Sequence, residues 1–263
     1  MGKIPRNPSP NGIEYTYTSI TSSDNYNLAY SLEQGTASLP SGYNVFGDGE
    51  DTLSYGLIAY YPLNGTYLAN DISGNNNNGV TYGATLTTGI NGEANGAYNF
   101  DGVNDKIELG KFLNSTNINN FTISLWTKGV INPNEFSYII HQGISDSIGN
   151  SIIWIGPNNA GTIAFSFDGQ YVAGMTNINF NSNEWYHLVM TYNGSVVSGY
   201  INSVVKNEHS DTSIANVISD TILSIGTSHI TSPSRAFEGS ISDVRIYNRV
   251  LSSSEISLLY AQR

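Results

Sequence analysis

The chain has 263 residues, only 12% of them charged, and its 21 acidic residues against 10 basic ones give a net charge of −11. This balance excludes a nucleic-acid-binding protein, because such a protein needs a basic surface to displace phosphate counterions. The absence of cysteine excludes disulfides, thiolate metal sites and cysteine nucleophiles. No apolar run is long enough to span a membrane.

The first part of the chain reads as a small β-hairpin followed by a linker. Two runs rich in β-formers, EYTYTS (14–19) and YNLAYSLE (26–33), are separated by a Ser/Thr/Asp turn. Residues 47–56 are rich in glycine and acids and have the composition of a linker. We therefore predict a hairpin segment over 1–46, a linker over 47–56 and a larger domain over 57–263.

The larger domain alternates apolar and polar residues in runs of five to eight, separated by Asn/Gly turns. In FTISLWTK (121–128), for example, Phe121, Ile123 and Leu125 share one face. No helical pattern lies between these runs, so the predicted fold class is all-β, a large sandwich of antiparallel sheets, and a parallel α/β fold is disfavoured.

One helix is predicted, at the C-terminal end. Ser252 and Glu255 have the spacing of a capping box. Ile256, Leu259 and Tyr260 follow with helical spacing, so we expect a short helix that packs against a sheet edge.

Several stretches, in order, resemble the laminin-G-like branch of the concanavalin A-like lectin/glucanase superfamily. They are LIAYYPLNGT (57–66), DISGNNNNG (71–79), YNFDGVNDKIEL (98–109), FTISLWTK (121–128), NEWYHLVMTYNG (183–194) and FEGSISDVRIYNRVLSSSEI (237–256). The resemblance implies a jelly-roll sandwich of two antiparallel sheets that binds carbohydrate or protein, with hydrolysis in some relatives.

A second resemblance concerns the N-terminal fifth of the chain. IPRNP (4–8) leading into aromatic-rich strands is similar to the globular tail of type IV pilins and pseudopilins. The long apolar helix of those proteins is not among these residues. If the likeness holds, it implies a filament or cell-surface subunit that assembles with other pilin-like subunits.

The resemblance also implies a calcium site. Asp71, Ser73, Asn75 and Asn77 match the family's Asp-x-Ser-Gly-Asn-x-Asn-x-Gly loop, and an oxygen-rich turn of this kind suits calcium. Asp243 is the natural second ligand, because it lies in a strand on the same face as Ile241 and Arg245, where an unpaired carboxylate is costly. Two alternatives stay open: Asp243 pairs with Arg245, and Asp71 caps backbone amides.

A sugar site needs aromatic faces beside amides and carboxylates. The two central strand–loop regions supply the candidates Tyr138, His141, Gln142, Trp154, Asn158, Asp168 and Tyr171. The alternative is that these side chains serve packing, as we expect for Trp126 and Trp185.

Hydrolysis is not predicted. The Glu-x-Asp-x-x-Glu string of the glucanases in this fold does not occur, nor does a Gly-x-Ser-x-Gly or His-Glu-x-x-His motif. The sequence thus favours a non-enzymatic, secreted or cell-surface bacterial module that binds carbohydrate or a glycosylated surface. The alternatives are a pilus or filament subunit without ligand binding, and a glycoside hydrolase of the same fold.

Overall fold

The chain divides into two compact units, residues 1–56 and residues 57–263. The computed structural model describes residues 15–19, 26–30, 53–111, 120–130, 136–143, 151–158, 161–167, 170–172, 180–210, 221–228 and 235–262. In the first unit, β1 (Tyr15–Ser19) pairs antiparallel with β2 (Tyr26–Tyr30). This pairing confirms the predicted hairpin, while the proline segment and most of the predicted linker lie outside the described residues.

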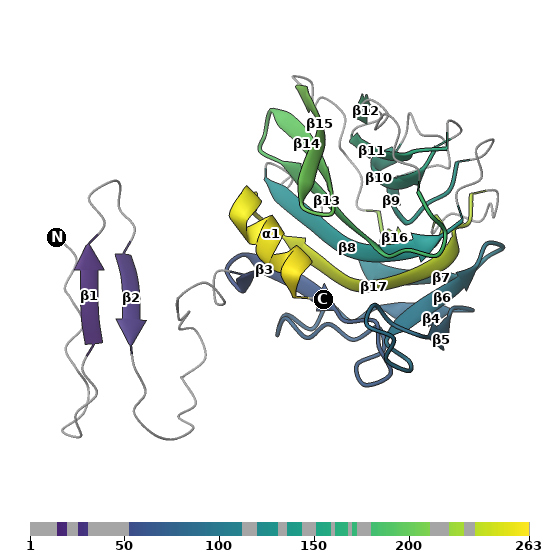
Figure 1. Cartoon of the computed structure of the whole chain (residues 1–263), viewed down its shortest axis with the longest axis horizontal. Coiled ribbons are helices and arrows are strands. Elements are labelled where there is room, and N and C mark those ends of the chain that lie inside the picture. The colour runs from purple at the N-terminus through teal and green to yellow at the C-terminus, as the bar shows by residue number, and fades with distance from the viewer. Residues whose placement is uncertain are drawn as a thin grey trace. The chain divides into compact units, whose positions relative to one another are not determined.

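The second unit is built from two antiparallel sheets (Figure 1). The seven-stranded sheet has the order β12-β11-β10-β9-β16-β7-β4, with β4 (Val80–Tyr82), β7 (Lys106–Gly110), β9 (Ile140–Gly143), β10 (Ser151–Pro157), β11 (Ile163–Phe167), β12 (Gln170–Val172) and β16 (Leu223–Ile225). The eight-stranded sheet has the order β15-β14-β13-β8-β17-β6-β5, with β3 also paired to β17; its strands are β3 (Leu57–Tyr61), β5 (Thr85–Thr87), β6 (Ala97–Asp101), β8 (Phe121–Gly129), β13 (Tyr186–Tyr192), β14 (Val196–Ile201), β15 (Val204–Ser210) and β17 (Glu238–Tyr247). The predicted all-β sandwich is confirmed.

The core lies between the inner faces of the two sheets. Phe121 of β8, in the eight-stranded sheet, contacts Phe167 of β11, in the seven-stranded sheet, with ring centroids 5.4 Å apart. Ile123 and Leu125 are also fully buried in this core, as the alternation predicted. Burying such side chains stabilises the fold by roughly 1.5–3 kcal/mol each.

A β-bulge in β17 changes which side chains face the core. One edge of β17 pairs with β8, and the register between them shifts between Ser242 and Arg245. Asp243 has a φ of +49°, a left-handed conformation that Asp tolerates better than most residues. Because of the bulge, Ile241 and Val244 both reach the core while Asp243 and Arg245 lie on the outer side. The expectation that Asp243 shares a face with Ile241 was therefore wrong.

The predicted helix is present as α1 (Ser253–Ala261), with Ser252 as N-cap and a complete capping box. Its Tyr260 ring stacks on Trp126 of β8, with 5.5 Å between centroids and 13° between planes. Since β8 lies in the middle of the eight-stranded sheet, α1 packs on the outer face of that sheet and not on its edge, which corrects the prediction. No helix in the described part of the chain combines the length and apolarity needed to cross a membrane.

Candidate functional site

A hollow of about 560 Å³ opens beside the C-terminal end of α1, and we call it the Trp185 hollow. It is lined by Ile90, Asn91, Glu184, Trp185, Asn202 and Tyr260. Ligand pockets usually have volumes of about 300–1,000 Å³ and combine apolar rings with a few polar groups, so this hollow has the size and the composition of a binding site.

Two aromatic rings form its apolar part. Trp185 precedes β13 and is half-buried, with the Lys128 ammonium 5.4 Å from its ring centroid. Tyr260 is also half-buried, and the contact with Trp126 occupies one of its faces. Each ring is thus held by a neighbour and keeps part of its surface open to the hollow.

An amide side chain is fixed at the tight turn between β14 and β15. Asn202 and Ser203 have φ values of +51° and +63°, as in a type I′ hairpin turn. The Oδ1 atom of Asn202 accepts from the backbone N–H of His187 at 2.9 Å, and its own N–H donates to the carbonyl of His187 at 2.8 Å. The Nδ2 atom of Asn202 has no hydrogen-bond partner among the described residues.

The loop that supplies Asn91 is organised by a carboxylate. Glu93 accepts a hydrogen bond from the backbone N–H of Asn91 at 2.8 Å. Gly89 and Gly96 leave room for this carboxylate, because a Cβ atom at either position would collide with it. Glu184, another lining residue, accepts hydrogen bonds from Asn181 and from the hydroxyl of Tyr186.

A second, smaller hollow of about 140 Å³ shares Ile90 and Asn91 with the first, and we call it the Asp243 hollow. Its further lining includes Asn64, Glu93, Asp243 and Gln262. It is therefore a polar extension of the aromatic Trp185 hollow.

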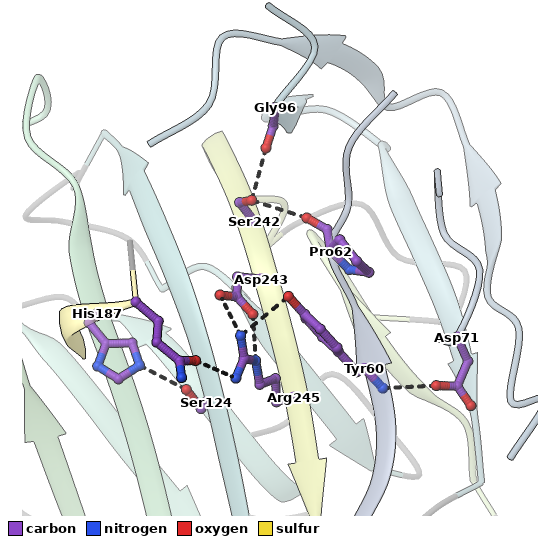
Figure 2. Close-up of polar contacts among 10 residues, drawn as sticks. Tyr60, Pro62, Asp71, Gly96, Ser124, His187, Ser242, Asp243 and Arg245 are labelled. Carbon is purple, nitrogen blue, oxygen red and sulfur yellow. Dashed lines mark hydrogen bonds and ion pairs between the residues drawn. The ribbon is translucent and has the colours of Figure 1, made fainter. Parts of the chain in front are cut away.

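Beneath α1 lies a buried polar network (Figure 2). Arg245 Nε donates to Asp243 Oδ1 at 2.7 Å, and its Nη2 atom donates to Asp243 Oδ2 and to the Tyr60 hydroxyl, each at 3.2 Å. Burial alone lowers the pKa of Arg245, but the charge and hydrogen bonds of Asp243 together with the neighbouring Tyr60 and Tyr247 outweigh burial and hold this pKa above its usual value. Arg245 therefore stays charged and is committed to Asp243.

His187 is a buried histidine on the same outer face of the eight-stranded sheet. Its Nε2 atom lies 2.8 Å from the hydroxyl of Ser124, and it is 1% exposed. Burial, together with the nearby charge of Arg245, lowers its pKa to about 3. His187 is therefore neutral at physiological pH and no acid or base at that pH.

The predicted metal loop forms hydrogen bonds with the edge of β3 that is not paired with another of the described strands. Asp71 accepts hydrogen bonds from the backbone N–H groups of Tyr60, Ser73 and Asn77, all at 2.9 Å. Burial raises the pKa of Asp71, but these bonds outweigh burial and hold the pKa below its usual value. Asn75 and Asn77 use their Nδ2 atoms as donors to the carbonyl of Ile58, at 3.2 and 2.7 Å.

The structure does not bring the five predicted metal ligands together. Figure 2 shows Asp71 and Asp243 on opposite sides of the strand that carries Tyr60, and Asp243 is bound to Arg245. Ser73 Oγ is engaged by Asn75, whose Nδ2 atom lies 3.0 Å away. Both alternatives considered from the sequence are thus present, and the donors do not fit the predicted calcium site. Among the described residues there is also no group of three or more His, Cys, Asp or Glu side chains that could hold a metal ion.

Four of the predicted sugar-binding residues lie in strands of the seven-stranded sheet: His141, Gln142, Trp154 and Tyr171. His141 is opposite Trp154, which is opposite Ser166, and Ser166 is opposite Tyr171, so three predicted residues fall in one row of the strand register. Trp154 is fully buried, and its Nε1 donates to the carbonyl of Ser137 at 2.9 Å.

Tyr138 packs against two of these residues. The Tyr138 ring lies 4.3 Å from His141 and 6.3 Å from Trp154, and the Arg235 guanidinium lies over Tyr138. All three aromatic side chains are 0% exposed, so they form a packing cluster that a ligand does not reach. This corrects the expectation of an open stacking surface.

The remaining predicted residues are dispersed. Gln142 is opposite Ile153, a core residue, and so lies on the other face of the sheet from His141. Asn158 closes the turn after β10 by accepting from the N–H and the hydroxyl of Thr162. Tyr171 lies in β12 without a described side chain, and Asp168 lies outside the described residues.

The residues of the Trp185 hollow were not predicted as a site. Trp126 is buried, as expected for a packing residue, but Trp185 is half-exposed and lines the hollow. Asn91, Asn202 and Tyr260 come from three separate segments, and no spacing in the sequence relates them. The one signal was a large aromatic residue placed just before a buried strand.

Comparison with known families gives a match over residues 100–257 to a laminin-G-type model described as the concanavalin A-like lectin/glucanases superfamily. No curated protein matches this chain significantly.

Several solved structures share the fold. Domain 4 of AbnA, a GH43 extracellular arabinanase from Geobacillus stearothermophilus in complex with arabinotriose, is 19% identical with a TM-score of 0.60, and the match covers 78% of this chain and 98% of that one. The binding domain of Paraclostridial Mosquitocidal Protein 1 is 20% identical with a TM-score of 0.61, covering 80% of this chain and 53% of that one. Trypanosoma rangeli sialidase is 16% identical with a TM-score of 0.60, and the match covers 78% of this chain and 33% of that one. The chain thus spans about half of the matched toxin domain and a third of the sialidase.

Proposed function

The chain belongs to the concanavalin A-like lectin/glucanases superfamily, and on that premise we propose that it is a carbohydrate-binding module whose ligand site is the Trp185 hollow. The observation that carries the proposal is the composition of this hollow: two half-exposed aromatic rings, Trp185 and Tyr260, line a volume of about 560 Å³ together with amide and carboxylate side chains. Aromatic rings bind the C–H faces of sugars, and amides and carboxylates exchange hydrogen bonds with hydroxyl groups.

The polar groups are placed to serve this role. Asn202 lines the hollow and is held through its Oδ1 by the backbone of β13, which fixes the position of its amide. Glu184 is oriented by Asn181 and Tyr186. Preorganised groups of this kind lose little entropy when a ligand binds.

Binding without hydrolysis is the role we assign to this hollow. A glycosidase needs two carboxyl groups that flank one bond, with one of them able to act as an acid. Glu184 accepts hydrogen bonds through both of its oxygens, and Asp243 is committed to Arg245. An extracellular location suits such a module, and the AbnA relative is itself described as part of an extracellular enzyme. Assembly into pilin-like filaments stays a prediction for the N-terminal segment, which the family match over 100–257 does not cover.

A glycan array followed by calorimetry with the best glycan tests the proposal. Arabinotriose is a suitable first probe, because it is the sugar in the AbnA complex. We expect binding that Trp185→Ala weakens by about tenfold or more, since stacking on one ring contributes roughly 1–3 kcal/mol.

The matched control is Tyr82→Ala, which removes a 45% exposed aromatic ring from β4 in the other sheet and should leave affinity unchanged. Equal affinity of the wild type and Trp185→Ala, with both folded, would overturn the assignment of the site. Release of reducing sugar by the wild-type protein would overturn the non-enzymatic role.

A further inference from the structure

The two hollows form one composite groove. They share Ile90 and Asn91, and α1 contributes to both, through Tyr260 in the first and Gln262 in the second. A ligand with more than one sugar ring that stacks on Trp185 therefore has room to extend into the adjoining Asp243 hollow.

The charges along this groove have one sign. Glu184 belongs to the first hollow, and Glu93 and Asp243 belong to the second. Among the described lining residues of the two hollows there is no lysine or arginine. The chain as a whole carries −11, which adds to the negative potential.

The nearest cations do not reverse this sign. Arg245 is bound to Asp243 through two hydrogen bonds and has a side chain that is 11% exposed. Lys128 lies over the Trp185 ring, and its single positive charge stands against the two carboxylates, Glu93 and Glu184, that Arg245 does not neutralise. An anionic sugar placed in the groove thus loses hydration and gains no free cationic partner from the lining residues.

We propose that the groove selects uncharged oligosaccharides and rejects those that carry a carboxylate, with Glu93 and Glu184 as the residues that set this selectivity. The inference rests on the proposed carbohydrate-binding function and adds the class of ligand. Neutral hydroxyl groups can donate to Glu93 and Glu184, whereas a sialic or uronic acid carboxylate is repelled by them. Selectivity of this kind depends on weaker binding of the acidic glycan as much as on tighter binding of the neutral one.

Matched pairs of glycans test this selectivity on the full chain. The array carries lactose beside 3′-sialyllactose, and a β-1,4-linked glucose trimer beside its C6-oxidised glucuronate trimer. We expect the neutral member of each bound pair to bind about tenfold more tightly, a difference that narrows at high ionic strength because screening weakens the repulsion. Glu93→Gln combined with Glu184→Gln should reduce the preference by about threefold or more, since each amide keeps one acceptor oxygen and the pair of substitutions removes two charges.

The control variant removes two charges elsewhere. Glu108→Gln combined with Glu208→Gln changes the net charge by the same amount, on β7 and β15, outside both hollows. An unchanged preference in this control and a reduced one in the groove variant support the proposal. Equal or tighter binding of the acidic glycans, still dependent on Trp185, would overturn the selectivity and leave the carbohydrate-binding function standing. Absence of any Trp185-dependent glycan binding would overturn both.

Discussion

Asp243 and Arg245 form an ion pair on the outer side of β17, with Arg245 Nε 2.7 Å from Asp243 Oδ1. The pair can form because the bulge at Asp243 places both side chains on that side. The Arg245 guanidinium also lies 4.3 Å from the centre of the Tyr60 ring and donates to Gln262 of the α1 C-cap. This one ion pair therefore connects β17 to β3 and to α1, the element that supplies Tyr260 to the Trp185 hollow.

Asp243→Asn should destabilise the fold by about 3 kcal/mol, because it leaves the mostly buried charge of Arg245 without its counterion. Asparagine tolerates the left-handed backbone, so the loss reports the charge and not backbone strain. Urea unfolding followed by circular dichroism measures it. Glu108→Gln is the matched control, since it breaks the more exposed Lys106–Glu108 pair and should cost less than about 1 kcal/mol. Equal losses in the two variants would contradict this account.

Asp71→Ala should destabilise by about 2–4 kcal/mol, since it removes the acceptor of three backbone N–H groups at the edge of β3. Asp101→Ala is a suitable comparison, because Asp101 caps the exposed turn at Val103 and Asn104 and should cost about 1 kcal/mol or less. Thermal melts of both variants give the comparison. A smaller loss of stability for Asp71→Ala than for Asp101→Ala would show that the loop does not stabilise the edge of β3.

Chelation should leave the melting midpoint of the wild-type chain unchanged, and added calcium should not raise it. The physical reason is that Asp71 and Asp243 already have partners on opposite sides of β3. Paired melts with EDTA and with excess calcium chloride measure this. A calcium-dependent rise that Asp71→Asn abolishes would restore the site predicted from the sequence, because ligand binding to the folded state must raise its stability.

The side of each strand that faces the core could be predicted from the sequence, because side chains alternate between the two faces of a strand and only two arrangements are possible. Phe121, Ile123 and Leu125 were placed in the core correctly, and Ser252 with Glu255 gave the start of α1. The same periodicity failed at Asp243, since a bulge adds one residue and moves every later side chain to the other face. The left-handed backbone conformation of Asp243 cannot be recognised in a pattern of apolar and polar residues.

The candidate site could not be predicted for a related reason. Its residues come from a loop at Asn91, the approach to β13 at Trp185, a hairpin turn at Asn202 and the end of α1 at Tyr260. The turn chemistry of each segment is local, but their convergence depends on where α1 docks on the sheet. The aromatic cluster around Trp154 shows the opposite case: its residues do share a face, and only the covering contacts of Tyr138 and Arg235 remove it from solvent.

Acid should destabilise the domain through His187. Its pKa of about 3 in the fold lies below the value of about 6.5 in an unfolded chain, so the unfolded state takes up the proton first. The resulting contribution to stability is complete above pH about 6.5 and is lost by about 1.4 kcal/mol for each pH unit as the pH falls toward 3. Unfolding free energies between pH 6.5 and 4.5 measure this dependence in a window above the usual pKa values of Asp and Glu, and comparison with a His187 variant isolates the part that comes from His187.

His187→Gln should flatten this dependence, since glutamine cannot be protonated and its amide can still bond to the hydroxyl of Ser124. The matched control is His209→Gln in β15, a strand at the edge of the eight-stranded sheet, which should retain the slope of the wild type. The same slope in the wild type and in His187→Gln would contradict the assignment. Tyr260 lies over His187, with 6.1 Å between ring centroids, so the loss should include the docking of α1. Near-ultraviolet circular dichroism of the Trp126–Tyr260 stack should therefore change in step with the unfolding free energy, and a stack that persists while stability falls would show that α1 docking is independent of His187.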